Sequence, residues 1–166
     1  MPSLDQTKQQ AASLYWLAFL LTGESENSAE IAAEALEPSD GNAFFSAWML
    51  GWARKVVIAR ALGAIRPELA ASARRIAATS RRRPAPGLPW DWTLASDAGK
   101  RELERALLAI DAFPRCVLLL LMFEGLSMDD AIVLLDADRE LIRKAQIFAL
   151  QELASNLASD REASLV

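Results

Sequence analysis

The chain has 166 residues, of which 52% are hydrophobic and 24% are charged, and its net charge is −4. This length is enough for one large domain or two small ones with an apolar core, and the composition is typical of a compact, mainly helical protein. One cysteine and no histidine exclude an internal disulfide, a structural zinc site and any chemistry that uses histidine as a base or metal ligand.

The charge is distributed unevenly along the chain. Residues 51–83 contain nine basic side chains and one acidic side chain, a net charge of +8, which leaves −12 on the rest of the chain. A basic segment within an acidic protein indicates a surface for nucleic acid or for an acidic partner. The alternative interpretation is a solvated helix face followed by a basic linker.

No membrane or secretion segment is expected. The N-terminus, MPSLDQTKQQ, is polar and has no apolar signal core. The longest central apolar run, Val117 to Phe123, is far too short to span a bilayer. We therefore expect a cytoplasmic protein with no membrane partner.

In chain order, the sequence first predicts a helix from Leu4 to Thr22 that ends at Gly23. Ser28 is the expected N-cap of a second, shorter helix. The stretch PSDGN at residues 38–42 has the turn residues of a loop. A third helix is predicted from about Ala43 to Leu62, because its apolar residues form a broad side with basic residues between them.

The third predicted helix carries candidates for nucleic-acid contact. Arg54, Lys55 and Arg60 are its candidate DNA-binding residues, because a phosphate-contacting surface needs a density of positive charge rather than a motif. Trp48 and Trp52, four residues apart, fit either the apolar core or a platform on which bases stack.

A proline-rich linker is the predicted domain boundary. A basic helix is expected from Pro67 to about Ala78, and the linker follows it. Trp90 and Trp92 lie within the linker and indicate docking on a partner or on the first domain. The prediction is two small all-α domains, residues 1–78 and 98–160, joined by a linker at residues 79–97.

Four helices are predicted in the C-terminal domain, near residues 98–111, 113–124, 128–135 and 139–158. The last is the longest, and its apolar residues fall at three- and four-residue steps. Cys116 lies in the apolar stretch RCVLLLLMF, so we expect a buried packing residue rather than a nucleophile.

The stretch ALLAIDAFPRCVLLLLMFEGLSMDDAIVLLDADRELIRKAQIFALQEL resembles the promoter-reading domain of bacterial RNA polymerase sigma factors of the extracytoplasmic-function type. The matching residues are Leu107, Phe113, Pro114, Arg115, Val117, Leu120, Glu124, Gly125, Leu126, Ser127, Asp130 and Leu135. The resemblance implies a helix-turn-helix whose second helix contacts upstream promoter DNA.

The residue types of this stretch suit a helix-turn-helix. Gly125 can adopt the backbone geometry between two helices without steric cost. Ser127 is the expected N-cap of the next helix, with Asp129 and Asp130 in the first turn, where the helix dipole favours acids. Residues 136–138 are expected to make the turn.

The helix after that turn is the candidate reading helix. Its candidate DNA-binding residues are Arg139, Glu140, Arg143 and Lys144. The alternative is an ordinary solvated helix face on which Glu140 and Asp138 pair with the basic side chains, within an acidic domain that repels DNA.

The stretch LYWLAFLLTGESENSAEIAAEAL resembles the other domain of the same family, and AWMLGWARKVVIARAL resembles a later helix of that domain. The matching residues of the first stretch are Leu14, Tyr15, Ala18, Leu21, Thr22, Gly23, Ala29, Glu30 and Glu34. The resemblance implies that core RNA polymerase is a partner and that Glu30, Ile31 and Glu34 contact it. It also implies that residues 51–83 meet DNA or polymerase near the downstream promoter element.

Some residues depart from the family pattern. Ala145, Ile147 and Phe148 interrupt the basic face of the reading helix, and the family usually has arginine at the first and last of these positions. Leu121 replaces a common basic residue, and the segment from Glu34 to Trp48 is shorter than in the family. Two hypotheses therefore stay open. One is a divergent extracytoplasmic-function sigma factor or sigma-like transcription regulator. The other is a sigma mimic that binds a protein, such as an anti-sigma factor, with little DNA binding.

No catalytic, cofactor-binding or metal-binding group of residues is expected. The sequence has no phosphate-binding glycine loop and no nucleophile–base pattern. Asp129 and Asp130 are neighbours in a predicted helix and do not face each other, so we expect capping rather than paired-carboxylate chemistry. The sequence thus predicts a protein that is not an enzyme.

Overall fold

The computed structural model describes residues 4–36, 43–79 and 99–164, apart from the side chains of residues 7, 43–50, 161 and 164. The described residues form helices and turns and contain no strand, so the expected all-α fold class is confirmed. None of the described helices combines the length and apolar character that a bilayer crossing needs.

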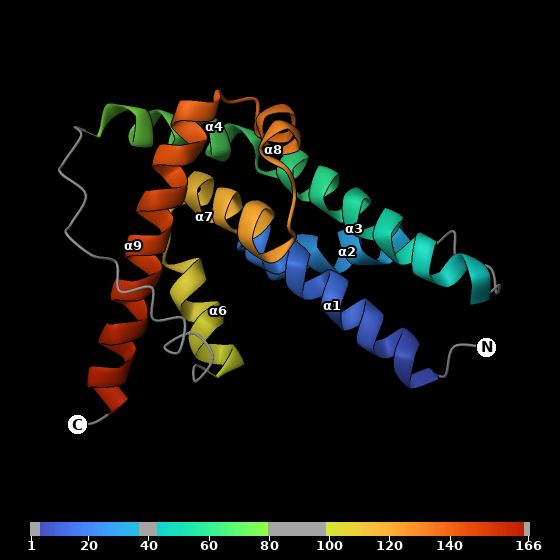
Figure 1. Cartoon of the computed structure of the whole chain (residues 1–166). Coiled ribbons are helices and arrows are strands. Elements are labelled where there is room, and N and C mark those ends of the chain that lie inside the picture. The colour runs from blue at the N-terminus through green and yellow to red at the C-terminus, as the bar shows by residue number, and fades with distance from the viewer. Residues whose placement is uncertain (1–3, 37–42, 80–98, 165–166) are drawn as a thin grey trace. The chain divides into compact units, whose positions relative to one another are not determined.

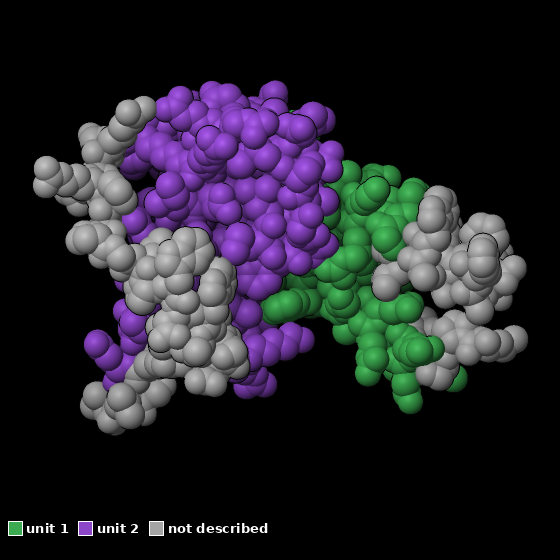
Figure 2. Space-filling model, in the orientation of Figure 1, with its two compact units in different colours: residues 1–66 green, residues 67–166 purple. Residues whose placement is uncertain are grey.

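The chain divides into two compact units, Met1–Arg66 and Pro67–Val166, which Figure 2 colours separately. The division therefore falls before the fourth helix, whereas the sequence predicted a boundary after it. The predicted loop at residues 38–42 lies outside the described residues. So does the predicted linker, including Trp90 and Trp92, except for Thr79.

Unit 1 consists of three helices that contact one another in pairs (Figure 1): α1 (Leu4–Thr22), α2 (Ser25–Leu36) and α3 (Ala43–Ala64). The sides of these helices that face one another are apolar, and the burial of these apolar side chains is the main source of stability of unit 1. The buried residues include Leu14, Leu17, Leu21, Ala32, Ala35, Val57, Ile58 and Leu62.

The connection between α1 and α2 differs in part from the prediction. Gly23 has a φ of 77° and donates its N–H to the Phe19 carbonyl at 2.7 Å, so it ends α1 as expected. Ser28, however, is not an N-cap, because α2 begins at Ser25. The Ser28 hydroxyl is buried and donates to the Glu24 carbonyl four residues earlier, as serine side chains inside helices often do.

Unit 2 contains the remaining elements: α4 (Arg66–Ala78), α6 (Lys100–Leu108), α7 (Ala112–Leu118), η1 (Leu119–Phe123), α8 (Met128–Leu135) and α9 (Arg139–Ser164). The long helix α9 packs against α6, α7 and α8 (Figure 1). The core of unit 2 includes Leu107, Ile110, Phe113, Leu118, Leu120, Ile142 and Ala149.

The element η1 is a π-helical turn, where the sequence predicted a continuous α-helix over 113–124. The Glu124 N–H bonds the Leu119 carbonyl, five residues earlier, at 2.9 Å. A π turn adds a residue to the helical repeat and so rotates the chain beyond it. Leu119 remains in the core, whereas Met122 and Phe123 are exposed.

Candidate nucleic-acid interface

Three residues set the local geometry of the α8–α9 pair. The Ser127 hydroxyl accepts the Asp130 N–H at 3.1 Å and opens α8, as the sequence predicted. Asp136 ends α8 in the left-handed region, with φ 49° and ψ 51°. The Asp138 carboxylate then accepts the Leu141 N–H at 2.8 Å and opens α9. Two helices are thus joined by the expected turn at residues 136–138.

Arg139, the first residue of α9, is bound back to α8. Its Nη2 donates to Asp129 Oδ1 at 2.9 Å. Both side chains are largely exposed to solvent, so this ion pair contributes little to stability. It nevertheless offsets the charge of one candidate DNA-binding residue.

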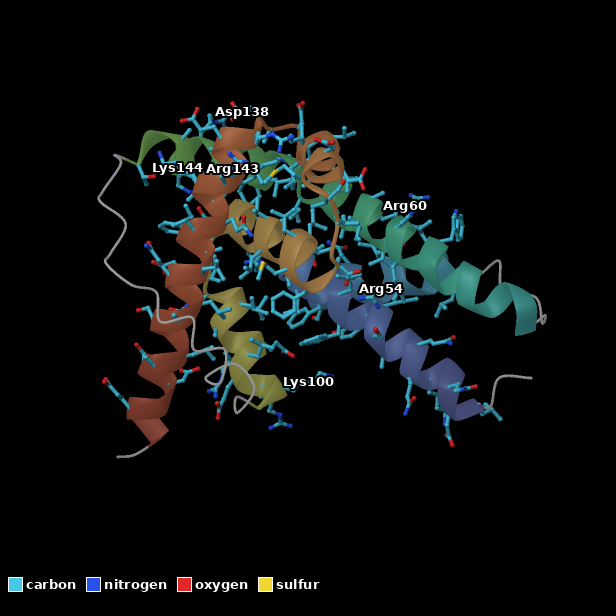
Figure 3. The ribbon with its side chains drawn as sticks, viewed as in Figure 1. Arg54, Arg60, Lys100, Asp138, Arg143 and Lys144 are labelled. Atoms are coloured by element: carbon cyan, nitrogen blue, oxygen red, sulfur yellow. The ribbon has the colours of Figure 1, made fainter. Side chains whose placement is uncertain are left out.

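Lys144 is directed toward α4. Its Nζ donates to the Thr79 carbonyl at 2.6 Å and lies 3.4 Å from the Ala77 carbonyl, at the C-terminal end of α4 (Figure 3). A cation is favoured there, because the last carbonyls of a helix lack partners and carry the negative end of its dipole. A second candidate DNA-binding residue is therefore engaged within unit 2.

Arg143 and Glu140 lie on the exposed side of α9. Arg143, which Figure 3 labels, is exposed, and among the described residues it has no hydrogen-bond or ion-pair partner. Glu140 is also exposed, one turn before Arg143. Arg143 is thus the candidate DNA-binding residue of α9 whose charge is most available.

The three residues that interrupt the basic pattern have different environments. Ala145 is fully buried, so it belongs to the core and not to the exposed face. The prediction that it interrupts that face is wrong, because α9 packs on this side with Ile142 and Ala149. Phe148 is half-buried, and Ile147 is 49% exposed one turn after Arg143.

The charge around the α8–α9 pair is negative. From Glu124 to Lys144 the chain has six acidic and three basic residues, a net charge of −3. Phosphate binding depends on positive charge that displaces the counterions of DNA. Electrostatics alone therefore opposes DNA at this surface.

The candidate DNA-binding residues of α3 are only partly free. Arg54 donates to the Ser13 hydroxyl at 3.0 Å, and Arg60 Nε lies 3.7 Å from Glu34 Oε2. Lys55 is exposed. Trp52 is 40% exposed and so is not a core residue, and the side chain of Trp48 lies outside the described residues.

The predicted polymerase-binding residues of α2 do not share one surface. Glu30 and Glu34 are exposed, whereas Ile31 is only 8% exposed. Ile31 has the helical spacing of Ala35, which places it on the packed side of α2. A partner at this helix would therefore meet the two carboxylates and not Ile31.

Sequence reasoning missed a polar cluster where α4 meets α7. Arg75 donates Nε to Asp111 Oδ2 and Nη2 to Asp111 Oδ1, both at 2.8 Å. The buried Ser72 hydroxyl accepts the Phe113 N–H at 2.9 Å. These partners are 36 and 41 residues apart in the chain, so no local pattern indicates them.

Cys116 is buried as expected, and burial raises the pKa of its thiol to about 12. It is therefore protonated and shielded. The described residues contain no group of three or more cysteine, aspartate or glutamate side chains that could hold a metal ion.

No protein-family model matches the chain, and no curated protein or solved structure matches it.

Proposed function

We propose that the chain is a sigma-like transcription regulator that acts with core RNA polymerase at promoter DNA. The observation that carries this proposal is the α8–α9 pair. Its helices are opened by Ser127 and Asp138 and joined through the left-handed Asp136, and these local features support the helix-turn-helix that the resemblance implies.

In this proposal α9 is the reading helix. Arg143 donates to a phosphate or to a guanine edge, and Glu140, one turn earlier, accepts from a cytosine amine. Arg139 and Lys144 add basic charge to the same helix, and their present partners are Asp129 and the end of α4. In unit 1, the exposed Glu30 and Glu34 form the surface offered to polymerase.

The DNA part of this proposal is tested by fluorescence anisotropy with a labelled duplex of random sequence at several salt concentrations. Arg143→Ala is expected to weaken binding more than Arg139→Ala or Lys144→Ala, because Arg143 has no competing partner among the described residues. The triple variant should lose nearly all affinity. A loss of only a few-fold in the triple variant would exclude α9 as the DNA-binding element.

A second candidate function, a sigma mimic that binds a protein, is favoured by one specific observation. Next to the net charge of −3, Val133 of α8 is 79% exposed and Ile147 of α9 is 49% exposed. Exposed apolar side chains among acids suit a protein surface better than a phosphate backbone. This candidate predicts no salt-dependent DNA binding in the same titration.

A further inference from the structure

Polar contacts attach the C-terminal half of helix α4 to the rest of unit 2. Arg75 binds Asp111 through two parallel hydrogen bonds of 2.8 Å, and Ser72 accepts the Phe113 N–H at 2.9 Å. At its C-terminal end, the Thr79 carbonyl accepts from Lys144 at 2.6 Å. Between them these contacts join α4 to α7 and to α9.

In these contacts, a side chain of one helix forms a hydrogen bond with a backbone group at the end of another helix. The first N–H groups of a helix and its last carbonyls have no partners within the helix. Ser72 of α4 satisfies Phe113 in the first turn of α7, and Lys144 of α9 satisfies the last carbonyls of α4. Leu69 and Ile76 of α4 are buried on the same side as Ser72. The docked position of α4 is therefore specific.

Docking of α4 has a consequence for α9. The Lys144 ammonium group is held against two carbonyls at the negative end of the α4 dipole, so its charge is already partly offset. To contact a phosphate, Lys144 has to leave the Thr79 carbonyl. Binding of Lys144 to α4 and its binding to DNA therefore compete.

We propose that docked α4 is an autoinhibitory element that withholds Lys144 from DNA and thereby lowers the DNA affinity of α9. This inference rests on the proposed function of α9. The apparent dissociation constant for DNA equals the intrinsic one divided by the fraction of molecules in which α4 is released. Any change that weakens the docking of α4 tightens DNA binding until Lys144 is fully available.

The test uses two variants that break the Arg75–Asp111 pair in the full chain. Arg75→Gln removes the donor, and Asp111→Asn removes the charge while it keeps an oxygen that can accept the Ala112 N–H. The matched control is Arg74→Gln, because Arg74 is the neighbouring exposed arginine of α4 and has no polar partner among the described residues. Binding is measured by anisotropy with a labelled duplex of random sequence.

Asp111→Asn is expected to bind the duplex about two- to fivefold more tightly than the parent chain, the range expected when an exposed ion pair is lost. Arg75→Gln is expected to bind more tightly than Arg74→Gln, which loses the same charge. The slope of log K against log salt should stay the same, because parent and variants reach the same DNA-bound state and differ only in the fraction of molecules in which α4 is already released.

A double-mutant cycle with Lys144→Gln separates this mechanism from a general charge effect. The gain from Asp111→Asn should disappear when Lys144 is also changed, because no cation is then released. A gain of equal size with and without Lys144 would overturn the proposal. Hydrogen exchange at the Phe113 amide should accelerate in Asp111→Asn, and unchanged exchange would also overturn it, because the ion pair would then not hold α4.

The two proposals fail in different ways. If the parent chain binds DNA and polymerase but no variant binds DNA more tightly, only the autoinhibitory role of α4 is wrong. If no variant binds DNA at any salt concentration, the proposal that α9 reads DNA is wrong. The proposed autoinhibitory role of α4 is then also wrong, because it depends on DNA binding by α9.

Discussion

At the scale of the residue, Asp111 supports two elements at once. Its carboxylate accepts the Ala112 N–H at 3.0 Å as the N-cap of α7, and it accepts both hydrogen bonds from Arg75 of α4. The hydrogen bonds from Arg75, with a smaller contribution from Ser72, hold the pKa of Asp111 below its ordinary value. The ionised carboxylate is therefore the form that the folded protein favours.

The lowered pKa of Asp111 predicts how stability depends on pH. Because the folded state has the lower pKa, the ionised carboxylate stabilises the fold at pH values above its ordinary pKa of about 4. This contribution is lost as pH falls through the folded pKa. We expect Asp111→Asn to be less stable than the parent chain at pH 7, and the difference to shrink progressively below pH 4. Urea denaturation at several pH values measures this stability difference. A difference that does not depend on pH would contradict the lowered pKa of Asp111.

Cys116 gives a second prediction at this scale. With a pKa of about 12 and a fully buried thiol, it should not react with a thiol reagent at pH 8 in the native protein. The same reagent should modify one thiol per chain in strong denaturant, because the sequence has one cysteine. Rapid modification of the native chain would show that this part of unit 2 opens readily.

At the scale of the element, backbone conformation decides where unit 2 turns. The π turn η1 is followed by Gly125, whose φ is +66°, and the cap of α8 comes two residues later. The sequence predicted the glycine and the cap, because both are local devices. It did not predict η1, because the residues of that stretch are equally suited to an α-helix and only their packing distinguishes the two forms.

Alanine substitutions at two glycines should have opposite effects. Gly125→Ala is expected to cost about 1 kcal/mol, because an L-residue at positive φ is strained although no atom lies within 4 Å of the added Cβ. Gly51→Ala lies inside α3 in open space and should stabilise by about 0.5–1 kcal/mol. Each effect is measured by urea denaturation. Equal effects at both sites would contradict the turn geometry.

Arginine substitutions on α9 test which side of this helix is exposed. Ala145→Arg should cost about 3 kcal/mol or more, because it buries an unpaired charge in the core. Ile147→Arg should change stability by less than about 0.5 kcal/mol, because this position is exposed. Ile147→Arg should also tighten binding to a random-sequence duplex. If Ala145→Arg folded normally and gained DNA affinity, the burial of this side of α9 would be wrong.

At the scale of the whole molecule, the sequence predicted more of the fold than of the site. Helix limits such as Leu4–Thr22 and Met128–Leu135 were predicted correctly, because caps and apolar spacing lie within each helix. The placement of α4 in unit 2 could not be predicted, because the contacts that join α4 to α7 and α9 connect residues far apart in the chain. For the same reason, nothing local distinguished Lys144, which contacts α4, from the exposed Arg143.

We propose that this chain acts as a sigma-like regulator, and binding to core RNA polymerase tests this proposal most directly. The chain should be labelled at its N-terminus, because Cys116 is buried. Glu30→Lys serves as the surface variant, and Glu26→Lys, also exposed on α2 and equal in its change of charge, as the matched control. We expect saturable binding in the nanomolar to low micromolar range that the surface variant weakens and the control does not. No binding at polymerase concentrations well above that range would contradict the account and leave a protein-binding sigma mimic as the function to pursue.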